Sequence, residues 1–289
     1  MKELCLVATV DDGYQEYIPL FVYFALSAYP HYELLIYLAG ALHPEVDACL
    51  RSIGAMGRFD VRPLSYRYDT DDPQSFKSLR WVLYDDDFAA YENLYIGDVD
   101  VLIARQEPSL CARRVRHSET IGLPYSNRIR PGSTKLVGIA HVVRTHAYFA
   151  ALLPLMQRYR DAIAAGTLRM HNEELLYRMM AESVGLPDPD AGLATHHGIH
   201  LRAFHTQRSL AQQRARTDYL FAETFEPHLD AFRAAARSEA CAEIVRRLSR
   251  IDASPARAAR YPGGGPAAVR QFGNVLSLCD DLLAEGAAR

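Results

Sequence analysis

The sequence predicts an α/β protein with a mostly parallel β-sheet, helices on both faces and a helical C-terminal extension. Three observations support this class. Short apolar runs, typical of buried strands, alternate with helical segments through the first two thirds of the chain. Turn signals containing Gly and Asp separate these segments. After about residue 205, apolar residues recur at spacings of three and four, which is typical of amphipathic helices.

The first strand is expected over Leu4–Val10, a nearly continuous apolar run that ends at the turn Asp11-Asp12-Gly13. The elements that follow, in chain order, are a helix at 18–28, a strand at 33–38, a helix at 43–53, a strand at 59–64, a helix at 76–84, strands at 93–96 and 137–143, and a helix at 148–164. Strands that alternate with helices favour parallel pairing within one sheet.

Beyond residue 205 the pattern predicts one helix over 229–251 and a last helix that ends near Glu285, separated by the Pro- and Gly-rich segment 262–266. We therefore divide the chain into a domain at 1–205 and a helical extension at 206–289. The extension is expected to pack on the first domain or on a second copy of the chain, as a homo-oligomer. Its polar face mixes charge signs, which disfavours a role at a membrane surface.

Composition excludes several classes of function. The chain has 289 residues and a formal net charge of -3, so no bulk electrostatic attraction to nucleic acid or anionic membrane is expected. Its five cysteines are far apart and form no C-x-x-C, which argues against a zinc ribbon or a disulfide scaffold and fits a reducing compartment. Neither a signal peptide nor a transmembrane stretch is recognisable. We expect a soluble cytoplasmic protein without a nucleic-acid partner.

Two carboxylates at the end of a strand carry the strongest chemical signal. Asp98 and Asp100 follow the apolar segment 93–96 and are spaced i, i+2, so they share one face of an extended chain. Ligands of open α/β sheets bind at the carboxyl edge of the strands, where these acids are expected. Paired carboxylates at such an edge are suited to a hard cation, Mg²⁺ or Mn²⁺.

Four segments together resemble GT-A fold glycosyltransferases, especially the retaining, family 8-like group that includes glycogenin and bacterial lipopolysaccharide galactosyl- and glucosyltransferases. The segments are Ala8–Tyr14, Phe76–Trp81, Tyr95–Asp100 and His171–Leu176. The resemblance covers about residues 4–205 and implies a GT-A fold. Gly97 departs from the family's metal motif, which usually has a polar residue there. Asn172-Glu173 also exchanges the chemical types of the family's Asp-Gln pair.

The resemblance implies a role for particular residues. Thr9, Asp11 and Tyr14 would contact the nucleoside of a nucleotide-sugar. Lys77 and Arg80 would lie near its diphosphate, and Asp98 would contact both donor and metal. Glu173 or Glu174 would stand at the reaction centre.

A fifth and poorer match, at 195–204, resembles the segment that ends the family's catalytic domain and supplies a histidine ligand. His197 is the preferred third metal ligand here, with His200 as the alternative. Arg202 stands where the family has a diphosphate-binding Lys.

The resemblance implies metal-dependent transfer of a sugar from a nucleotide-sugar, expected to be UDP-linked, with retention at the anomeric carbon. The acceptor, whether a glycan, a lipid-linked sugar or a small molecule, is not specified by the sequence. Two alternatives stay open. One is a non-catalytic relative that binds nucleotide-sugar or a protein. The other is a haloacid-dehalogenase-like phosphatase, although that class carries its D-x-D on the first strand.

A cluster of basic residues precedes a segment rich in Gly, Pro, Ser and Asn that extends to Lys135. The cluster comprises Arg113, Arg114, Arg116 and His117. We expect it to belong to an exposed basic loop, with a lid or acceptor rim as the alternative.

Overall fold

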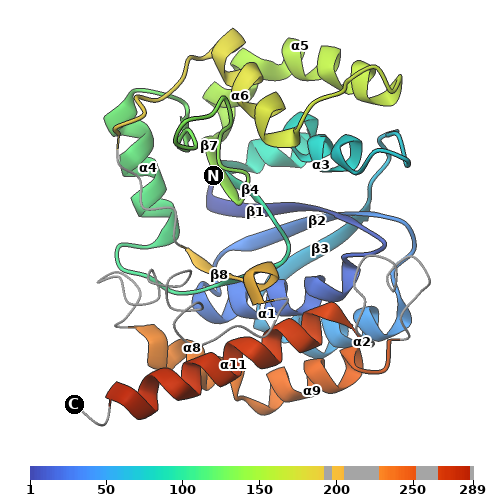
Figure 1. Ribbon diagram of the computed structural model, residues 1–289, viewed down its shortest axis with the longest axis vertical. Coiled ribbons are helices and arrows are strands. Elements are labelled where there is room, and N and C mark those ends of the chain that lie inside the picture. The colour runs from blue at the N-terminus through green and yellow to red at the C-terminus, as the bar shows by residue number, and fades with distance from the viewer. Residues whose placement is uncertain (192–196, 205–227, 252–265, 287–289) are drawn as a thin grey trace.

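One six-stranded sheet forms the centre of the molecule (Figure 1). The computed structural model describes residues 1–191, 197–204, 228–251 and 266–286. The strand order is β3-β2-β1-β4-β7-β6, with β1 (Lys2–Asp11), β2 (Glu33–Ala39), β3 (Arg58–Pro63), β4 (Tyr91–Gly97), β6 (Tyr125–Ser126) and β7 (Ala140–Arg144). The first four strands are parallel, whereas β7 and β6 pair antiparallel. The predicted α/β class with a mostly parallel sheet is confirmed.

Helices cover both faces of this sheet (Figure 1). Along β1, Leu4, Leu6, Ala8 and Val10 belong to one apolar core, and Cys5 and Val7 belong to the other. The first core is closed by α1 (Ile18–Ala28), α2 (Pro44–Ile53), α8 (Leu229–Ala236), α9 (Glu239–Leu248) and α11 (Ala267–Gly286). The second is closed by α3 (Pro73–Val82), α5 (Thr145–Ala164) and α6 (Asn172–Ser183).

Shorter elements complete the described chain. A separate two-stranded ribbon pairs β5 (Val101–Ile103) antiparallel with β8 (Gly198–His200). The helix α4 (Leu110–Ile121) packs beside β6 and β7. Four 3₁₀ helices are η1 (Gln15–Tyr17), η2 (Gly54–Met56), η3 (Asp86–Ala90) and η4 (Leu201–Phe204).

The C-terminal helices pack on the same face as α1 and α2. Phe24 of α1 contacts Phe232 of α8 at a ring-centroid distance of 4.9 Å and Phe272 of α11 at 5.8 Å. The helix predicted over 229–251 is in fact two helices, because Ser238 caps α9 by accepting a hydrogen bond from the Cys241 N–H at 3.1 Å. The predicted domain boundary near residue 205 and residues 262–265 of the predicted break lie outside the described residues.

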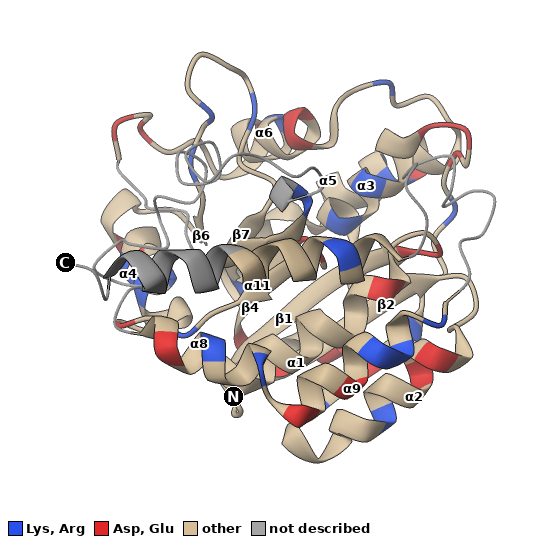
Figure 2. Ribbon diagram, turned by 60° about the horizontal axis from the view of Figure 1, so that its bottom comes forward, with Lys and Arg blue, Asp and Glu red and all other residues tan. Residues whose placement is uncertain are grey.

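The outer faces of α2 and α9 carry both signs of charge (Figure 2). Arg247 of α9 reaches Glu45 of α2 at 3.7 Å, and it also pairs with Glu243 of its own helix at 2.6 Å. Within the part of the chain that the structure describes, no helix is both long and apolar enough to cross a bilayer.

Two expectations for the segment 110–143 are corrected. The basic cluster lies on α4, where Arg114 and His117 are buried, and not in an exposed loop. The strand predicted at 137–143 begins only at Ala140 and runs antiparallel to β4. Val137 is buried and pairs with the segment around Asn127: the Asn127 amide donates to the Val137 carbonyl at 3.0 Å, and the Val137 N–H donates to the Arg128 carbonyl at 3.1 Å.

Candidate active site

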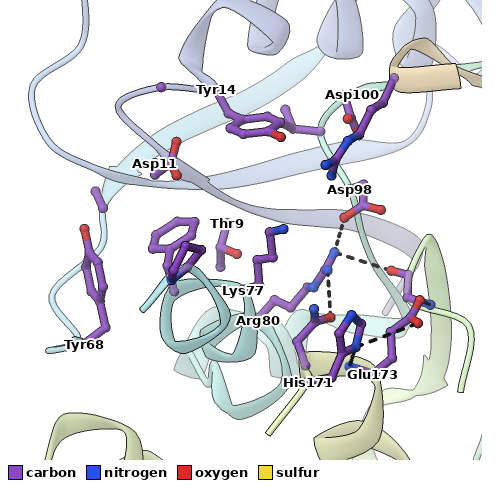
Figure 3. A pocket seen from close by; sticks show the side chains of 18 of the residues that line it. Thr9, Asp11, Tyr14, Tyr68, Lys77, Arg80, Asp98, Asp100, His171 and Glu173 are labelled. Atoms are coloured by element: carbon purple, nitrogen blue, oxygen red, sulfur yellow. Dashed lines mark hydrogen bonds and ion pairs between the residues drawn. The ribbon is translucent and has the colours of Figure 1, made fainter. Parts of the chain in front are cut away.

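A pocket of about 800 Å³ lies at the carboxyl ends of β1 and β4 (Figure 3). This is the edge at which open α/β sheets bind ligands. Nine of the residues predicted from the sequence line it: Thr9, Asp11, Tyr14, Lys77, Arg80, Asp98, Asp100, Glu173 and Arg202. The other two, Glu174 and His197, are not among the described residues of its lining.

Asp98 and Asp100 follow β4 and meet His200 from β8. Each of the three side chains offers one ligand atom, and these atoms lie within 4.8 Å of one another. The pairing of β5 with β8 brings this about, because His200 stands opposite Val101, next to Asp100. Two carboxylate oxygens and one imidazole nitrogen are a donor set that fits Mn²⁺ or Mg²⁺.

The charges of Asp100 and His200 stabilise each other. The His200 Nε2 lies 3.1 Å from the Asp100 Oδ1. Burial raises the pKa of the Asp100 carboxyl group, but the His200 imidazole, Arg202 and a backbone hydrogen bond together outweigh this effect, and the pKa lies below its usual value. Burial in turn lowers the pKa of His200, and the two nearby carboxylates outweigh it and raise that pKa to about 9. Asp100 is therefore an ionised carboxylate, as a metal ligand must be.

His197 has a different position from the one expected. Its Nε2 lies 2.8 Å from the Tyr95 Oη, and the side chain is only 3% exposed. Its backbone carbonyl accepts a hydrogen bond from the Ala104 N–H at 3.1 Å. Ala104 lies just past the far end of β5, three residues after Val101, which adjoins Asp100. The group that could hold a cation contains His200, the alternative histidine, and does not contain His197.

We call Asp98, Asp100 and His200 the metal group, because they could hold a cation. Arg80 joins this group to the start of α6. Its guanidinium forms an ion pair with Asp98, and its Nη2 donates to the Asn172 Oδ1 at 3.2 Å. Arg80 is 8% exposed and lies over the ring of Trp81 at 4.6 Å. Figure 3 shows its side chain extending from α3 toward Asp98, with Lys77 one turn earlier on the same side of the pocket.

Glu173 is held by a fork of hydrogen bonds. The Arg130 Nε donates to its Oε2 at 2.7 Å, the Arg130 Nη2 donates to its Oε1, and the Gly138 N–H donates to Oε1 at 2.8 Å. Burial raises the pKa of Glu173, but the hydrogen bonds from Arg130 and Gly138 outweigh burial and lower the pKa overall. Glu173 is thus an ionised carboxylate at neutral pH.

The opposite wall of the pocket is aromatic and acidic. Asp11 ends β1, Tyr14 lies in the loop after it, and Tyr68 also lines the pocket (Figure 3). The Asp12 Oδ1 accepts from the Gln15 Nε2 at 2.5 Å, which fixes the loop that carries Tyr14. A flat apolar surface beside carboxylates is suited to a nucleoside, whose base stacks and whose ribose donates hydrogen bonds.

The pocket residues to which the sequence analysis gave no role include Arg130, His171 and Tyr68. Arg130 lies on a short hairpin in which Ile129 and Leu136 form an antiparallel bridge. Pro131 and Gly132 signal the turn of this hairpin. No local pattern indicates that the hairpin packs against α6 and Glu173. His171 caps α6 by accepting from the Glu173 N–H at 3.2 Å, a role that its sequence position could have suggested.

No protein-family model and no curated protein sequence matches this chain. Among solved structures, the glycosyltransferase GlyE of Streptococcus pneumoniae TIGR4 is 8% identical, with a TM-score of 0.48 over 86% of this chain and 64% of that chain. An active-site mutant of LgtC is 15% identical, with a TM-score of 0.41 over 63% and 71%. The mannosyltransferase PcManGT of Pyrobaculum calidifontis, solved with GDP-Man and Mn²⁺, is 12% identical, with a TM-score of 0.39 over 99% and 86%. This chain thus spans less than two thirds of the length of GlyE.

Proposed function

We propose that this protein is a metal-dependent glycosyltransferase that transfers a sugar from a UDP-sugar to an acceptor hydroxyl, with retention of configuration. The observation that carries the proposal is the group of Asp98, Asp100 and His200 at the edge of a pocket that also has basic and aromatic walls. A nucleotide-sugar needs these three kinds of surface, for its base, its diphosphate and the cation that accompanies it.

Asp98, Asp100 and His200 would hold Mn²⁺ or Mg²⁺. A bound cation of this kind stabilises negative charge on a leaving diphosphate. The residues of the chain itself prepare the site for that ligand. Arg80 fixes Asp98 through an ion pair, and the Leu201 N–H donates to the Asp100 carbonyl at 2.8 Å. These contacts hold both carboxylates in place before the donor arrives, which is the usual requirement for a preorganised electrostatic site.

Lys77 and Arg202 supply positive charge on two sides of the pocket. In this proposal they bind the diphosphate oxygens, which become more negative as the bond to the sugar breaks. Donors placed in advance stabilise that developing charge more strongly than water does, because they need no reorganisation. Thr9, Asp11 and Tyr14 bind the nucleoside on the opposite wall.

Glu173 faces the pocket beyond Asp98 and would lie near the anomeric carbon. The sequence left two roles open, nucleophile or electrostatic stabiliser of an oxocarbenium-like centre. We favour the second role, because Arg130 and the Gly138 N–H already occupy both carboxylate oxygens. A nucleophilic carboxylate would have to break these hydrogen bonds before it attacks, whereas an electrostatic stabiliser keeps them. Glu174 lies outside the pocket lining, so Glu173 is the preferred reaction-centre acid.

The test is a donor panel that reports binding and turnover separately. UDP-, GDP-, CMP- and dTDP-sugars are added with and without Mn²⁺, and thermal unfolding and donor hydrolysis are followed for each. We expect a UDP-sugar to raise the unfolding temperature only when Mn²⁺ is present, because a ligand that binds the native state alone stabilises it. We also expect slow hydrolysis of that donor without acceptor. If no sugar nucleotide stabilises the protein with Mn²⁺, the proposal is wrong.

The same panel, extended by a set of acceptor sugars and a generic phosphate ester, decides between the alternatives. Stabilisation by a UDP-sugar without any hydrolysis, and without transfer to a panel of sugars, supports the non-catalytic relative. A phosphatase would instead release phosphate from a generic phosphate ester. The D-x-D of this chain follows β4, the fourth strand in chain order, whereas that class places it on the first strand.

A further inference from the structure

We propose that the C-terminal helix α11 positions two walls of the donor site, the nucleoside-binding loop 11–14 and the segment that carries Arg202. The proposal rests on the proposed function for the identity of the ligand. Its structural part, the coupling of α11 to the pocket, stands on contacts alone. Residues near the C-terminus would then control donor affinity, although none of the described residues of α11 lines the pocket.

The first contact joins α11 to η1, the short helix that follows the nucleoside-binding loop. The Tyr17 Oη donates to the Gln271 Oε1 at 3.0 Å, and the Glu16 Oε1 accepts from the Ala268 N–H at 3.1 Å. All four residues are at most 2% exposed. A buried carboxylate at the first turn of a helix is stabilised by the backbone N–H groups there, so this contact fixes η1 firmly on α11.

The second step leads from η1 into the pocket. The ring of Tyr17 stacks on the ring of Tyr14 at a centroid distance of 5.4 Å, and Tyr14 lines the pocket. Gln15, the first residue of η1, holds Asp12 through its Nε2 and accepts from the His43 N–H at 2.7 Å. Any displacement of η1 therefore moves both an aromatic and an acidic residue of the nucleoside wall.

The third step concerns the other side of the same helix. α11 packs against η4 (Leu201–Phe204), which carries Arg202. The Leu201 N–H is hydrogen-bonded to the Asp100 carbonyl at 2.8 Å, so η4 is also tied to the metal group. One helix thus contacts the segments behind both the nucleoside wall and the Arg202 wall (Figure 1).

The chain offers a matched pair of variants that test this coupling. Tyr17→Phe removes the hydroxyl that reaches α11, and Tyr23→Phe removes a hydroxyl that reaches the α8–α9 junction at the Ala235 carbonyl, 2.9 Å away. Both changes delete one hydroxyl that bonds the C-terminal helices, but Tyr23 lies on α1 and outside the pocket lining. Gln271→Leu provides a second removal of the same contact from the side of α11.

Two readouts are measured on the full chain. The first is the Kd of UDP with Mn²⁺, together with KM and kcat for the UDP-sugar donor. We expect Tyr17→Phe and Gln271→Leu each to raise Kd and KM about fivefold, with kcat nearly unchanged, because a net hydrogen bond is worth about that factor. The second is hydrogen exchange of the Tyr14 and Tyr17 amides, which bond to the carbonyls of Asp11 and Tyr14. We expect these amides to exchange faster in Tyr17→Phe and Gln271→Leu, and to exchange at the wild-type rate in Tyr23→Phe.

Each outcome decides a separate point. Equal changes in Tyr17→Phe and Tyr23→Phe, or no change in either, overturn the proposal, because α11 would then act only on global stability. Failure of UDP to bind the wild-type protein refutes the proposed function and leaves hydrogen exchange to decide the coupling. Unchanged exchange at Tyr14 and Tyr17 in both α11-contact variants overturns the coupling whatever the ligand is.

Discussion

The ring of Tyr95 fills the space that a side chain at position 97 would need. A Cβ placed on Gly97 would lie 2.6 Å from the Tyr95 Cζ and 2.6 Å from the Ile139 carbonyl oxygen. The Tyr95 Oη in turn donates to that carbonyl at 3.2 Å and contacts the His197 Nε2. The glycine that precedes the acidic pair, which departs from the family motif that the sequence resembles, is therefore required by the packing beneath it.

Replacement of Gly97 by Ala tests this relationship. The backbone carbonyl of Ile139 accepts a hydrogen bond from the Asp98 N–H at 3.3 Å, so it cannot move without disturbing Asp98. We expect Gly97→Ala to lower the free energy of unfolding by about 1–3 kcal/mol, as overpacking of a filled core usually does, and to weaken Mn²⁺ binding. Urea unfolding measures the first effect. The control is Gly54→Ala, where no atom lies within 4 Å of the new Cβ and stability should be nearly unchanged.

The two histidines near the acidic pair should respond differently to substitution. We expect His200→Gln to weaken Mn²⁺ binding by at least about tenfold, because it removes a side chain of the metal group. His197→Gln should instead lower stability, since the Tyr95 hydroxyl loses a buried partner, and leave Mn²⁺ affinity within about threefold of the wild type. Calorimetric titration with Mn²⁺ and thermal unfolding separate the two effects. Weaker Mn²⁺ binding in His197→Gln alone would restore the first assignment.

Strands and helices could be predicted where burial alone decides the pattern. The run Leu4–Val10 is apolar because β1 is the third of six strands and is covered on both faces. The segment 137–139 is also apolar, but its backbone turns into the pocket wall before β7 begins. Apolar character indicates burial and not backbone conformation. The prediction from it therefore started β7 at residue 137 and not at Ala140.

From local pattern alone, the site could be predicted only where it directly follows a strand, whereas Lys77, Arg80 and Glu173 were predicted from the family resemblance. Asp11 and Asp98 are recognisable because each stands at the end of a buried strand. The choice between His197 and His200 depends on the register of β5 with β8, which pairs residues about 100 positions apart. Such a register is set by tertiary packing and leaves no mark on local spacing. Arg130 was missed for the same reason, because its partner Glu173 is 43 positions away.

Arg130 should determine how the reaction depends on pH. Burial raises the pKa of Glu173 and the hydrogen bonds from Arg130 lower it, so removal of the guanidinium leaves only the Gly138 N–H and His171 to oppose burial. In Arg130→Gln we expect Glu173 to become protonated at higher pH and the acid limb of the pH–rate profile to move toward neutrality. The profile is measured as kcat between about pH 5 and pH 8. The control is Arg128→Gln, because Arg128 is exposed and lies on the same hairpin; its pH–rate profile should keep the acid limb of the wild type. An unmoved limb in Arg130→Gln would show that Glu173 ionisation does not control turnover.

The buried histidine of β7 should make the protein sensitive to acid. His141 is fully buried among Trp81, Tyr125 and Tyr148, and its Nδ1 lies 3.0 Å from the Asn127 Nδ2. Burial, with a smaller contribution from Arg114, lowers its pKa from 6.5 to about 3. The unfolded chain therefore binds a proton at a pH where the folded chain does not. Stability from this group is fully present above the unfolded pKa and falls as the pH drops below it.

Replacement of His141 by Gln removes the titrating group and keeps an amide oxygen for Asn127. Between the unfolded pKa and about 3, the wild type should lose up to about 1.4 kcal/mol per pH unit more than the variant, because one extra proton is bound on unfolding. Urea unfolding at a series of pH values gives both slopes. The variant is expected to be less stable than the wild type at neutral pH, since a packed imidazole is lost, and the two curves should converge as the pH falls. Parallel curves would mean that His141 is protonated in the folded protein, and the buried neutral imidazole would have to be abandoned.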